Sequence, residues 1–71
     1  MGLYRVDDKD GSPIEAGAGE VTYDDMYNAV MKISGAADDP EAECYSYYED
    51  NKACMDVTMP DGSFYKGYVY L

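Results

Sequence analysis

The side chains that could do chemistry in this chain are thiols and carboxylates. Two cysteines, Cys44 and Cys54, accompany fifteen acidic and five basic residues, and there is no histidine. A cysteine nucleophile needs a base beside it, and acidic neighbours raise the pKa of a thiol. Histidine is the usual general base near neutral pH. We therefore expect a protein that is not an enzyme, with no catalytic residue and no cofactor.

The segment DDKDGSPIE, residues 7–15, resembles a calcium-binding loop. Aligning Gly11 with the glycine of such a loop places Asp8 and Asp10 on ligand positions. The first and last ligand positions then fall on Val6 and Gly17, which supply no carboxylate. A turn rich in solvated acids fits better, and two thiols without histidine make a poor zinc site. No metal site is predicted, although weak binding of a divalent cation, here or at residues 37–43, stays open as an alternative.

The formal net charge is −10. A nucleic acid or an anionic membrane is not expected as a direct ligand, because binding to phosphates needs a basic patch that releases counterions. The favoured partner is a cation or a protein with a basic face. Self-repulsion at this charge opposes the compact state, so the charge needs a reason such as steering or solubility. Life at high salt is another reason that fits the low lysine count.

The acids fall into clusters along the chain. A DNA duplex carries one charge per about 1.7 Å of its axis, and a small acidic domain can present a similar density along one edge. A solvated, solubilising surface is the plainer interpretation. The carboxylates expected to bind a partner are Asp24, Asp25, Asp38, Asp39, Glu41, Glu43, Glu49 and Asp50.

The one helix is predicted over about residues 22–34. Thr22 can cap its first turn, and Asp25, three residues on, completes a weaker form of the capping box. Gly35 is a natural stop. Apolar residues at helical spacing form one stripe. The stripe consists of Tyr23, Met26, Tyr27, Val30 and Ile33.

Strands are predicted on both sides of the helix. Residues 3–6 form a short strand, residues 7–13 a turn, and residues 14–21 a second strand or a connection. After the polar connection of residues 36–43, three strands form an antiparallel meander. They cover residues 44–48, 53–59 and 64–71. The chain is thus expected to be a single two-layer α+β domain, residues 1–71, with one helix packed on an antiparallel sheet in the order β(β)αβββ.

The middle strand of this meander fixes which side chains face the helix. Ala53, Met55, Val57 and Met59 alternate with more polar residues and so point inward. A type I turn with a glycine bulge in PDGS pairs Val57 with Tyr65 and Asp56 with Lys66. The core then receives Tyr65, Val69 and Leu71.

The sequence allows two registers for the first hairpin, depending on the length of its turn. A two-residue turn at Asp50-Asn51 pairs Tyr48 with Ala53 and Cys44 with Val57, which sends Cys44, Ser46 and Tyr48 inward. The two cysteines then lie on opposite faces and form no disulfide. A longer turn would reverse the faces of the first strand.

In the favoured register the outer face of the sheet is aromatic. Five aromatic side chains on a face without a helix would make an apolar patch, which commonly marks an interface. The alternative is that the N-terminal strands cover this face, or that the rings pack on one another as a solvated ladder. The five residues expected to bind a partner here are Tyr45, Tyr47, Phe64, Tyr68 and Tyr70.

The segment PDGSFYKG, residues 60–67, resembles the core of a MORN repeat. A solenoid needs several stacked copies, and the chain holds one. We interpret the segment as a hairpin that uses the same kind of turn residues as a MORN repeat, without the repeat architecture. Gly67 is expected where a core residue of the helix comes close to the sheet.

Small size, strong acidity, the lack of catalytic groups and an aromatic face together resemble the small acidic inhibitors of phages and mobile elements, anti-CRISPR and DNA-mimic proteins among them. This resemblance implies binding to a nucleic-acid-handling protein and occupation of its basic, nucleic-acid-binding surface. One alternative is a structural or accessory domain that forms a homodimer through the tyrosine face or an edge strand. A cytoplasmic location is expected, in the host cytoplasm if the protein is phage-encoded, because no apolar run has transmembrane length and no signal peptide is evident.

Overall fold

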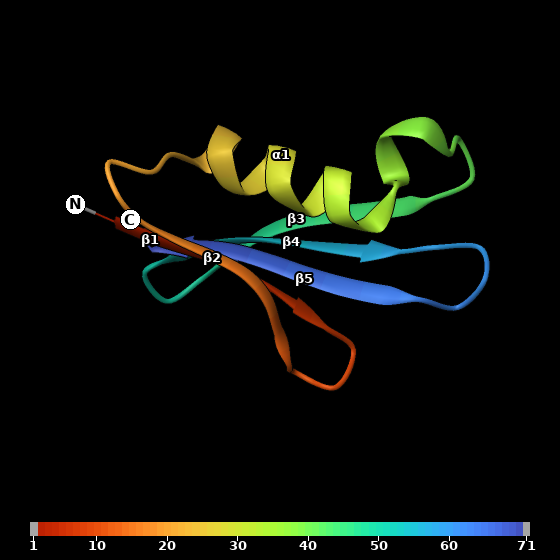
Figure 1. Cartoon of the computed structure of the whole chain (residues 1–71), viewed down its shortest axis with the longest axis horizontal. Helices are drawn as coiled ribbons and strands as arrows, with labels where there is room; N and C mark the ends of the chain where they lie inside the picture. The colour runs from red at the N-terminus through yellow and green to blue at the C-terminus, as the bar shows by residue number, and fades with distance from the viewer. Residues whose placement is uncertain (1, 71) are drawn as a thin grey trace.

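The computed structural model describes residues 2–70 and shows one helix packed on a five-stranded antiparallel sheet (Figure 1). The strands are β1 (Gly2–Asp8), β2 (Pro13–Gly19), β3 (Glu43–Glu49), β4 (Lys52–Thr58) and β5 (Phe64–Tyr70). Between β2 and β3 lie α1 (Tyr23–Ser34) and the short 3₁₀ helix η1 (Ala36–Asp38). The strand order is β2-β1-β5-β4-β3. The predicted α+β fold and its element order are confirmed.

The N-terminal hairpin extends the sheet. β1 pairs with β5, with Arg5 opposite Tyr68, and β2 pairs with the other side of β1. The residues before the helix therefore lie in the plane of the sheet and leave its outer face uncovered (Figure 1). The predicted turn at residues 7–13 was too long, since β1 continues to Asp8 and β2 starts at Pro13.

The predicted ends of α1 are confirmed. The Thr22 backbone N–H donates to Asp25 Oδ2 at 2.7 Å, and the Asp25 N–H donates to Thr22 Oγ1 at 3.3 Å, which completes the capping box. Gly35 ends the helix in the left-handed conformation, with φ 80°. The buried face consists of Met26, Ala29 and Val30, whereas Tyr27 is exposed. Of the predicted apolar stripe, Tyr27 does not belong to the face that packs on the sheet, because that face is narrower than the apolar spacing indicates.

The capping box gives a direct test of the start of α1. Thr22→Ala is expected to lower the free energy of unfolding by about 1 kcal/mol, because the Asp25 N–H loses its acceptor. For a domain of this size that corresponds to roughly 4–8 °C in Tm. Thermal unfolding followed by circular dichroism measures the change. Thr22→Ser keeps the hydroxyl acceptor and should stay close to the wild type; equal losses in both variants would contradict the cap.

The register of the meander is confirmed in both hairpins. Val57 pairs with Tyr65, Asp56 with Lys66, and Tyr48 with Ala53. The inward burial of β3 was wrong, however. Tyr48 is 78% exposed, and Cys44 and Ser46 are exposed too, because α1 packs mainly on β5, β1 and β4. It meets the edge strand at Tyr23, whose hydroxyl lies 3.0 Å from that of Ser46. Of the side chains predicted for the core, Val69 is buried and Tyr65 is partly buried, while Leu71 lies outside the described residues.

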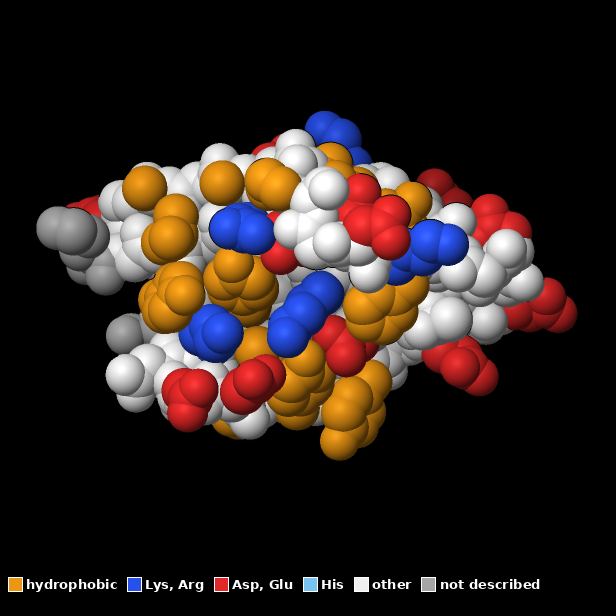
Figure 2. All heavy atoms as spheres, turned by 90° about the horizontal axis from the view of Figure 1, so that it is seen from below, with side chains coloured by type: hydrophobic (Ala, Val, Ile, Leu, Met, Phe, Trp, Pro, Cys, Tyr) orange, Lys and Arg blue, Asp and Glu red, His pale blue; other side chains and the backbone are white. Residues whose placement is uncertain are grey.

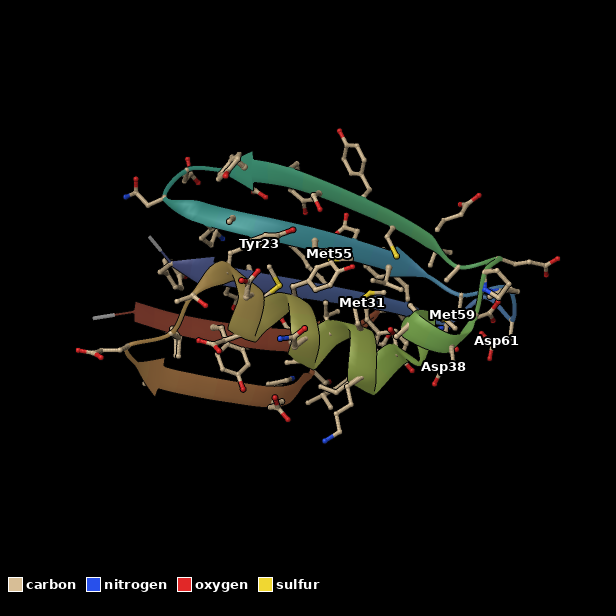
Figure 3. The ribbon with its side chains drawn as sticks, turned by 90° about the horizontal axis from the view of Figure 1, so that it is seen from above. Tyr23, Met31, Asp38, Met55, Met59 and Asp61 are labelled. Carbon is tan, nitrogen blue, oxygen red and sulfur yellow. The ribbon has the colours of Figure 1, made fainter. Side chains whose placement is uncertain are left out.

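The core lies between α1 and the three middle strands, and Figure 3 shows Met31 and Met55 on the side of the sheet that α1 covers. Gly67 lies under the helix. A Cβ atom built on Gly67 would meet Met26 Sδ at 2.7 Å and Val30 Cβ at 3.1 Å, which confirms the predicted close approach. The buried hydrophobic residues of this cluster are Val6, Met26, Ala29, Val30, Ala36, Ala53, Met55, Val57 and Val69.

Within residues 2–70, neither helix has the length and apolar character needed to cross a membrane.

Candidate functional site

The outer face of the sheet carries all five predicted aromatic residues. The register places Tyr47, Cys54, Tyr68 and Arg5 in one row across β3, β4, β5 and β1. The rows on either side hold Tyr45 and Tyr70, and Phe64 lies one row beyond Tyr45, also on this face. Of these five, Tyr45 and Tyr70 are exposed, at 67% and 43%, and the other three aromatic side chains are half-buried.

Basic side chains lie between these rings (Figure 2). Lys52 Nζ lies 5.0 Å from the centroid of the Tyr68 ring, and Lys66 Nζ lies 5.9 Å from that of Tyr47. The guanidinium of Arg5 lies 5.9 Å from the Tyr68 ring. Such cation–π contacts stabilise partly solvated rings. The face is therefore a mixed aromatic and charged surface and not the apolar patch that the sequence indicated.

The rings also contact one another. Tyr45 and Tyr47 stack with centroids 5.5 Å apart, and Tyr68 and Tyr70 meet edge to face at 5.8 Å. The Tyr47 hydroxyl donates to Asp56 Oδ1 at 3.2 Å, and burial raises the pKa of Tyr47. These contacts match the alternative of rings that pack on one another.

The two cysteines are free and lie on opposite faces of the sheet. Cys44 is exposed on β3, whereas Cys54 is fully buried on β4 although it belongs to the outer face. Its neighbours across the strands are Tyr47 and Tyr68. Burial raises the pKa of the Cys54 thiol, which keeps it protonated at neutral pH.

We expect the two thiols to differ strongly in reactivity. At neutral pH, Ellman's reagent should titrate Cys44 alone in the native protein, because reaction needs an accessible thiolate. The second thiol should react only after denaturant is added. Cys44→Ser should leave a native protein with no reactive thiol. Rapid reaction of that variant would show that the aromatic cover over Cys54 opens readily.

The acidic side chains of the predicted site lie at two ends of the molecule. Asp38 of η1 lies toward one end, the same end as Asp61 of the β4–β5 turn, which was not predicted as a site residue (Figure 3). The backbone N–H of Ser63 donates to Asp61 at 2.9 Å and holds the pKa of that carboxyl below its usual range. Asp24 and Asp25 open α1. Asp39 and Glu41 belong to the connection after η1, Glu43 begins β3, and Glu49 and Asp50 lie where β3 ends and turns into β4.

The net charge lies almost entirely off the outer face. By strand register that face carries three of the five basic residues and four of the fifteen acidic ones. The remaining surface therefore has eleven acids against two bases, a net charge of −9. The residues on the outer face are Arg5, Lys52, Lys66, Asp7, Glu43, Glu49 and Asp56.

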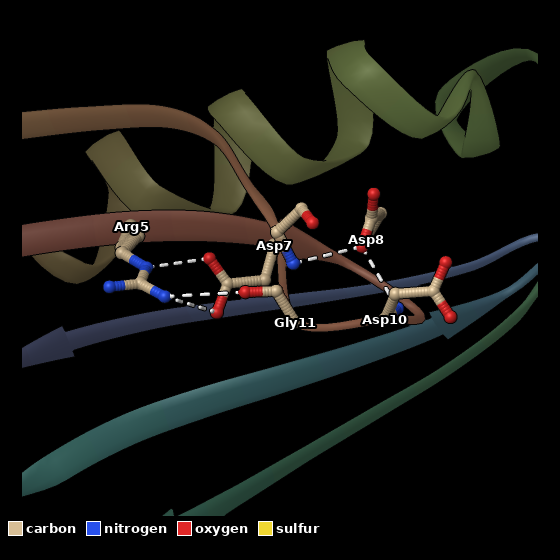
Figure 4. Close-up of polar contacts among 6 residues, drawn as sticks. Arg5, Asp7, Asp8, Asp10 and Gly11 are labelled. Carbon is tan, nitrogen blue, oxygen red and sulfur yellow. Dashed lines mark hydrogen bonds and ion pairs between the residues drawn. The ribbon is translucent and has the colours of Figure 1, made fainter.

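The acidic turn between β1 and β2 is closed by its own carboxylates (Figure 4). Asp8 Oδ1 accepts from the N–H groups of Asp10 and Ser12 at 2.9 and 3.0 Å. Asp7 is buried and pairs with Arg5, whose Nε lies 2.6 Å from Asp7 Oδ1. Within residues 2–70 no group of three or more carboxylate or thiol side chains is arranged to hold a metal ion.

Sequence reasoning did not assign Arg5, Asp7 and Lys52 to the outer face. Arg5 and Asp7 come from β1, and their place beside Tyr68 and Lys66 depends on the pairing of β1 with β5, two strands at opposite ends of the chain. The alternation of polar Arg5 with apolar Val6 indicates that Arg5 points away from the core. It does not indicate that β5 is the strand beside β1.

The fold and the two surfaces define the chain as a small acidic α+β domain with one helix on an antiparallel sheet. Comparison with protein-family models, with curated proteins and with solved structures finds no match.

Proposed function

We propose that this protein binds the basic, nucleic-acid-binding surface of a target protein and blocks access of the nucleic acid. The observation that carries the proposal is the segregation of charge. Cations gather among the outer tyrosines, and the helix side and the two ends of the domain are left almost purely acidic. This mode of action is that of the phage-type acidic inhibitors that the composition resembles.

The density of charge supports the same proposal. The domain is 35 Å long, and a net −9 outside the outer face corresponds to one charge per about 4 Å. One strand of B-DNA carries a phosphate every 3.4 Å or so. Averaged over the long axis, the net charge of the acidic surface thus approaches that of a single nucleic-acid strand, while the carboxylates of the site gather at the two ends. Lysine and arginine side chains that bind phosphates would pair with these carboxylates and steer the encounter.

The acids of the proposed site are available for such contacts. Asp24, Asp38, Glu41 and Asp50 are exposed and take part in no ion pair of the described residues. Tyr45 and Tyr48 on β3 are exposed as well and supply aromatic area. Tyrosine is enriched among residues that dominate binding energy.

The test is capture of the target from the native host at low salt, followed by elution with a salt gradient and competition with duplex DNA. A nucleic-acid-binding protein should elute as salt rises, because screening weakens exposed charge pairs. Duplex DNA and the acidic domain should exclude one another on that protein. An acidic partner, salt-insensitive binding, or a ternary complex with DNA would overturn the proposal. So would recovery of this chain alone as a salt-resistant dimer.

A further inference from the structure

The two edges of the sheet, β2 and β3, differ in how far they are protected. β2 begins at Pro13, has glycine at positions 17 and 19, and faces a register shift between Val6 and Asp7. These features blunt an edge, because proline donates no hydrogen bond and a bulge interrupts pairing. β3 contains no proline, glycine or lysine, and its register with β4 is continuous from Glu43 to Glu49. β3 is therefore the open edge.

The backbone of β3 is directed outward at alternate residues. Glu49 and Lys52 flank a two-residue turn and so form a hydrogen-bonded pair, after which bonded and non-bonded pairs alternate. Cys44, Ser46 and Tyr48 therefore direct their N–H and C=O groups away from β4. All three residues are exposed, and the Ser46 hydroxyl lies 3.0 Å from the Tyr23 hydroxyl of α1. An incoming strand would find three donors and three acceptors free along this edge.

We propose that β3 is a docking edge on which an extended, basic segment of a partner protein adds as a sixth strand. Main-chain hydrogen bonds give such strand addition its affinity, and alternate side chains give specificity. Glu43 and Glu49 lie at the two ends of β3 on the same face as Tyr45 and Tyr47. Glu43 takes part in no ion pair of the described residues, and Glu49, 3.6 Å from Lys66 Nζ, would share its charge between Lys66 and an incoming cation. The matching segment has Lys or Arg at two positions six residues apart, with β-branched or aromatic side chains at the second and fourth positions after the first cation.

A second copy of this chain fits the edge poorly. Antiparallel pairing of two β3 strands about Ser46 sets Glu43 of one copy opposite Glu49 of the other. Like charges directly opposite destabilise a strand pair, and each copy has a net charge of −10. The choice of a basic occupant rests on the proposed function, whereas the choice of the edge rests on the sheet order alone.

The probe is the acetylated, amidated heptapeptide Lys-Thr-Val-Thr-Val-Thr-Lys, added to the whole protein at millimolar concentration. Amide hydrogen exchange measured by NMR reports the contact residue by residue. The peptide should slow exchange at Cys44, Ser46 and Tyr48, whose N–H groups gain partners. Tyr45 and Tyr47, already bonded to β4, should change little. The same peptide with Glu in place of Lys should give no protection.

Two variants at Ser46 separate the effect of the outward backbone N–H from the effect of the side-chain hydroxyl. Ser46→Pro removes an outward N–H and leaves the ladder with β4 intact, while Ser46→Ala keeps that N–H and loses the same hydroxyl. Ser46→Pro should weaken peptide binding by about tenfold or more relative to Ser46→Ala, with both variants showing the wild-type circular dichroism spectrum.

Equal binding by the two variants, no alternation in the protection, or no binding of the basic peptide would each overturn the docking edge and leave the proposed function standing. Protection at the edge, together with a target that binds DNA and this domain at once, would support the edge and overturn the proposed function.

Discussion

Replacing Gly67 with alanine is expected to lower the free energy of unfolding by about 1–3 kcal/mol, the usual cost of adding a methylene to a packed core. The new Cβ would lie 2.7 Å from Met26 Sδ and 3.1 Å from Val30 Cβ. The sulfur ends a flexible segment and can move, but Val30 Cβ belongs to a helix and can yield only if α1 shifts. In a domain of 71 residues such a loss is a large part of the total stability.

A double-mutant cycle separates crowding from other effects. Met26→Ala alone should destabilise by roughly 2–5 kcal/mol, because a fully buried side chain leaves a cavity. In that background Gly67→Ala should cost clearly less, since the alanine methyl occupies space that the Met26 side chain vacates. Urea unfolding of the four proteins gives the coupling energy. Additive losses would show that α1 does not rest on Gly67.

The register of the meander could be predicted because turn chemistry sets it locally. Asp50-Asn51 and the PDGS segment fix which residues pair, and the opposite charges of Asp56 and Lys66 agree with the result. Gly67 followed from the same register, which sets it opposite Met55 on the helix side. Each of these inferences needs only residues close in sequence.

Burial on β3 could not be predicted from the same pattern. Alternation tells which face a side chain belongs to, and Tyr48 does belong to the helix face. It does not tell how far a helix of twelve residues extends across that face. Tyr48 is exposed because β3 is the edge strand, whereas α1 packs mainly on β5, β1 and β4.

The N-terminal hairpin was predicted weakly because its second strand is rich in glycine and alanine. The structure shows why one of these positions, residue 17, is occupied by glycine. A Cβ atom on Gly17 would overlap Cε2 of Tyr4, so the Tyr4 ring crosses β2 where only glycine leaves room. The Tyr4 hydroxyl then donates to Glu15 at 2.8 Å. Gly17 is glycine because the Tyr4 ring needs the space, and glycine has a low strand propensity. The sequence of β2 alone therefore gives little indication of a strand.

Reversing the charge of two acids beside the open edge is expected to weaken binding to a basic target by about tenfold per residue. Glu41→Lys with Glu43→Lys replaces two attractions by two repulsions, each worth on the order of 1 kcal/mol at an exposed surface. Both residues are exposed, so the fold should be unaffected. Titration calorimetry with the captured target at several salt concentrations measures the loss and its dependence on screening.

The control changes the same net charge at the opposite edge of the sheet. Asp10→Lys with Glu20→Lys also brings the formal net charge from −10 to −6, on exposed residues of the β1–β2 turn and of the segment after β2. If the acids near β3 contact the target, the control should bind only slightly more weakly than the wild type, through the reduced long-range attraction, and the difference should shrink as salt rises. Equal losses in the two variants would mean that total charge and not a local surface governs binding. In that case the acidic ends serve to steer the encounter, and the contact with the target has to be sought among the tyrosines of the outer face.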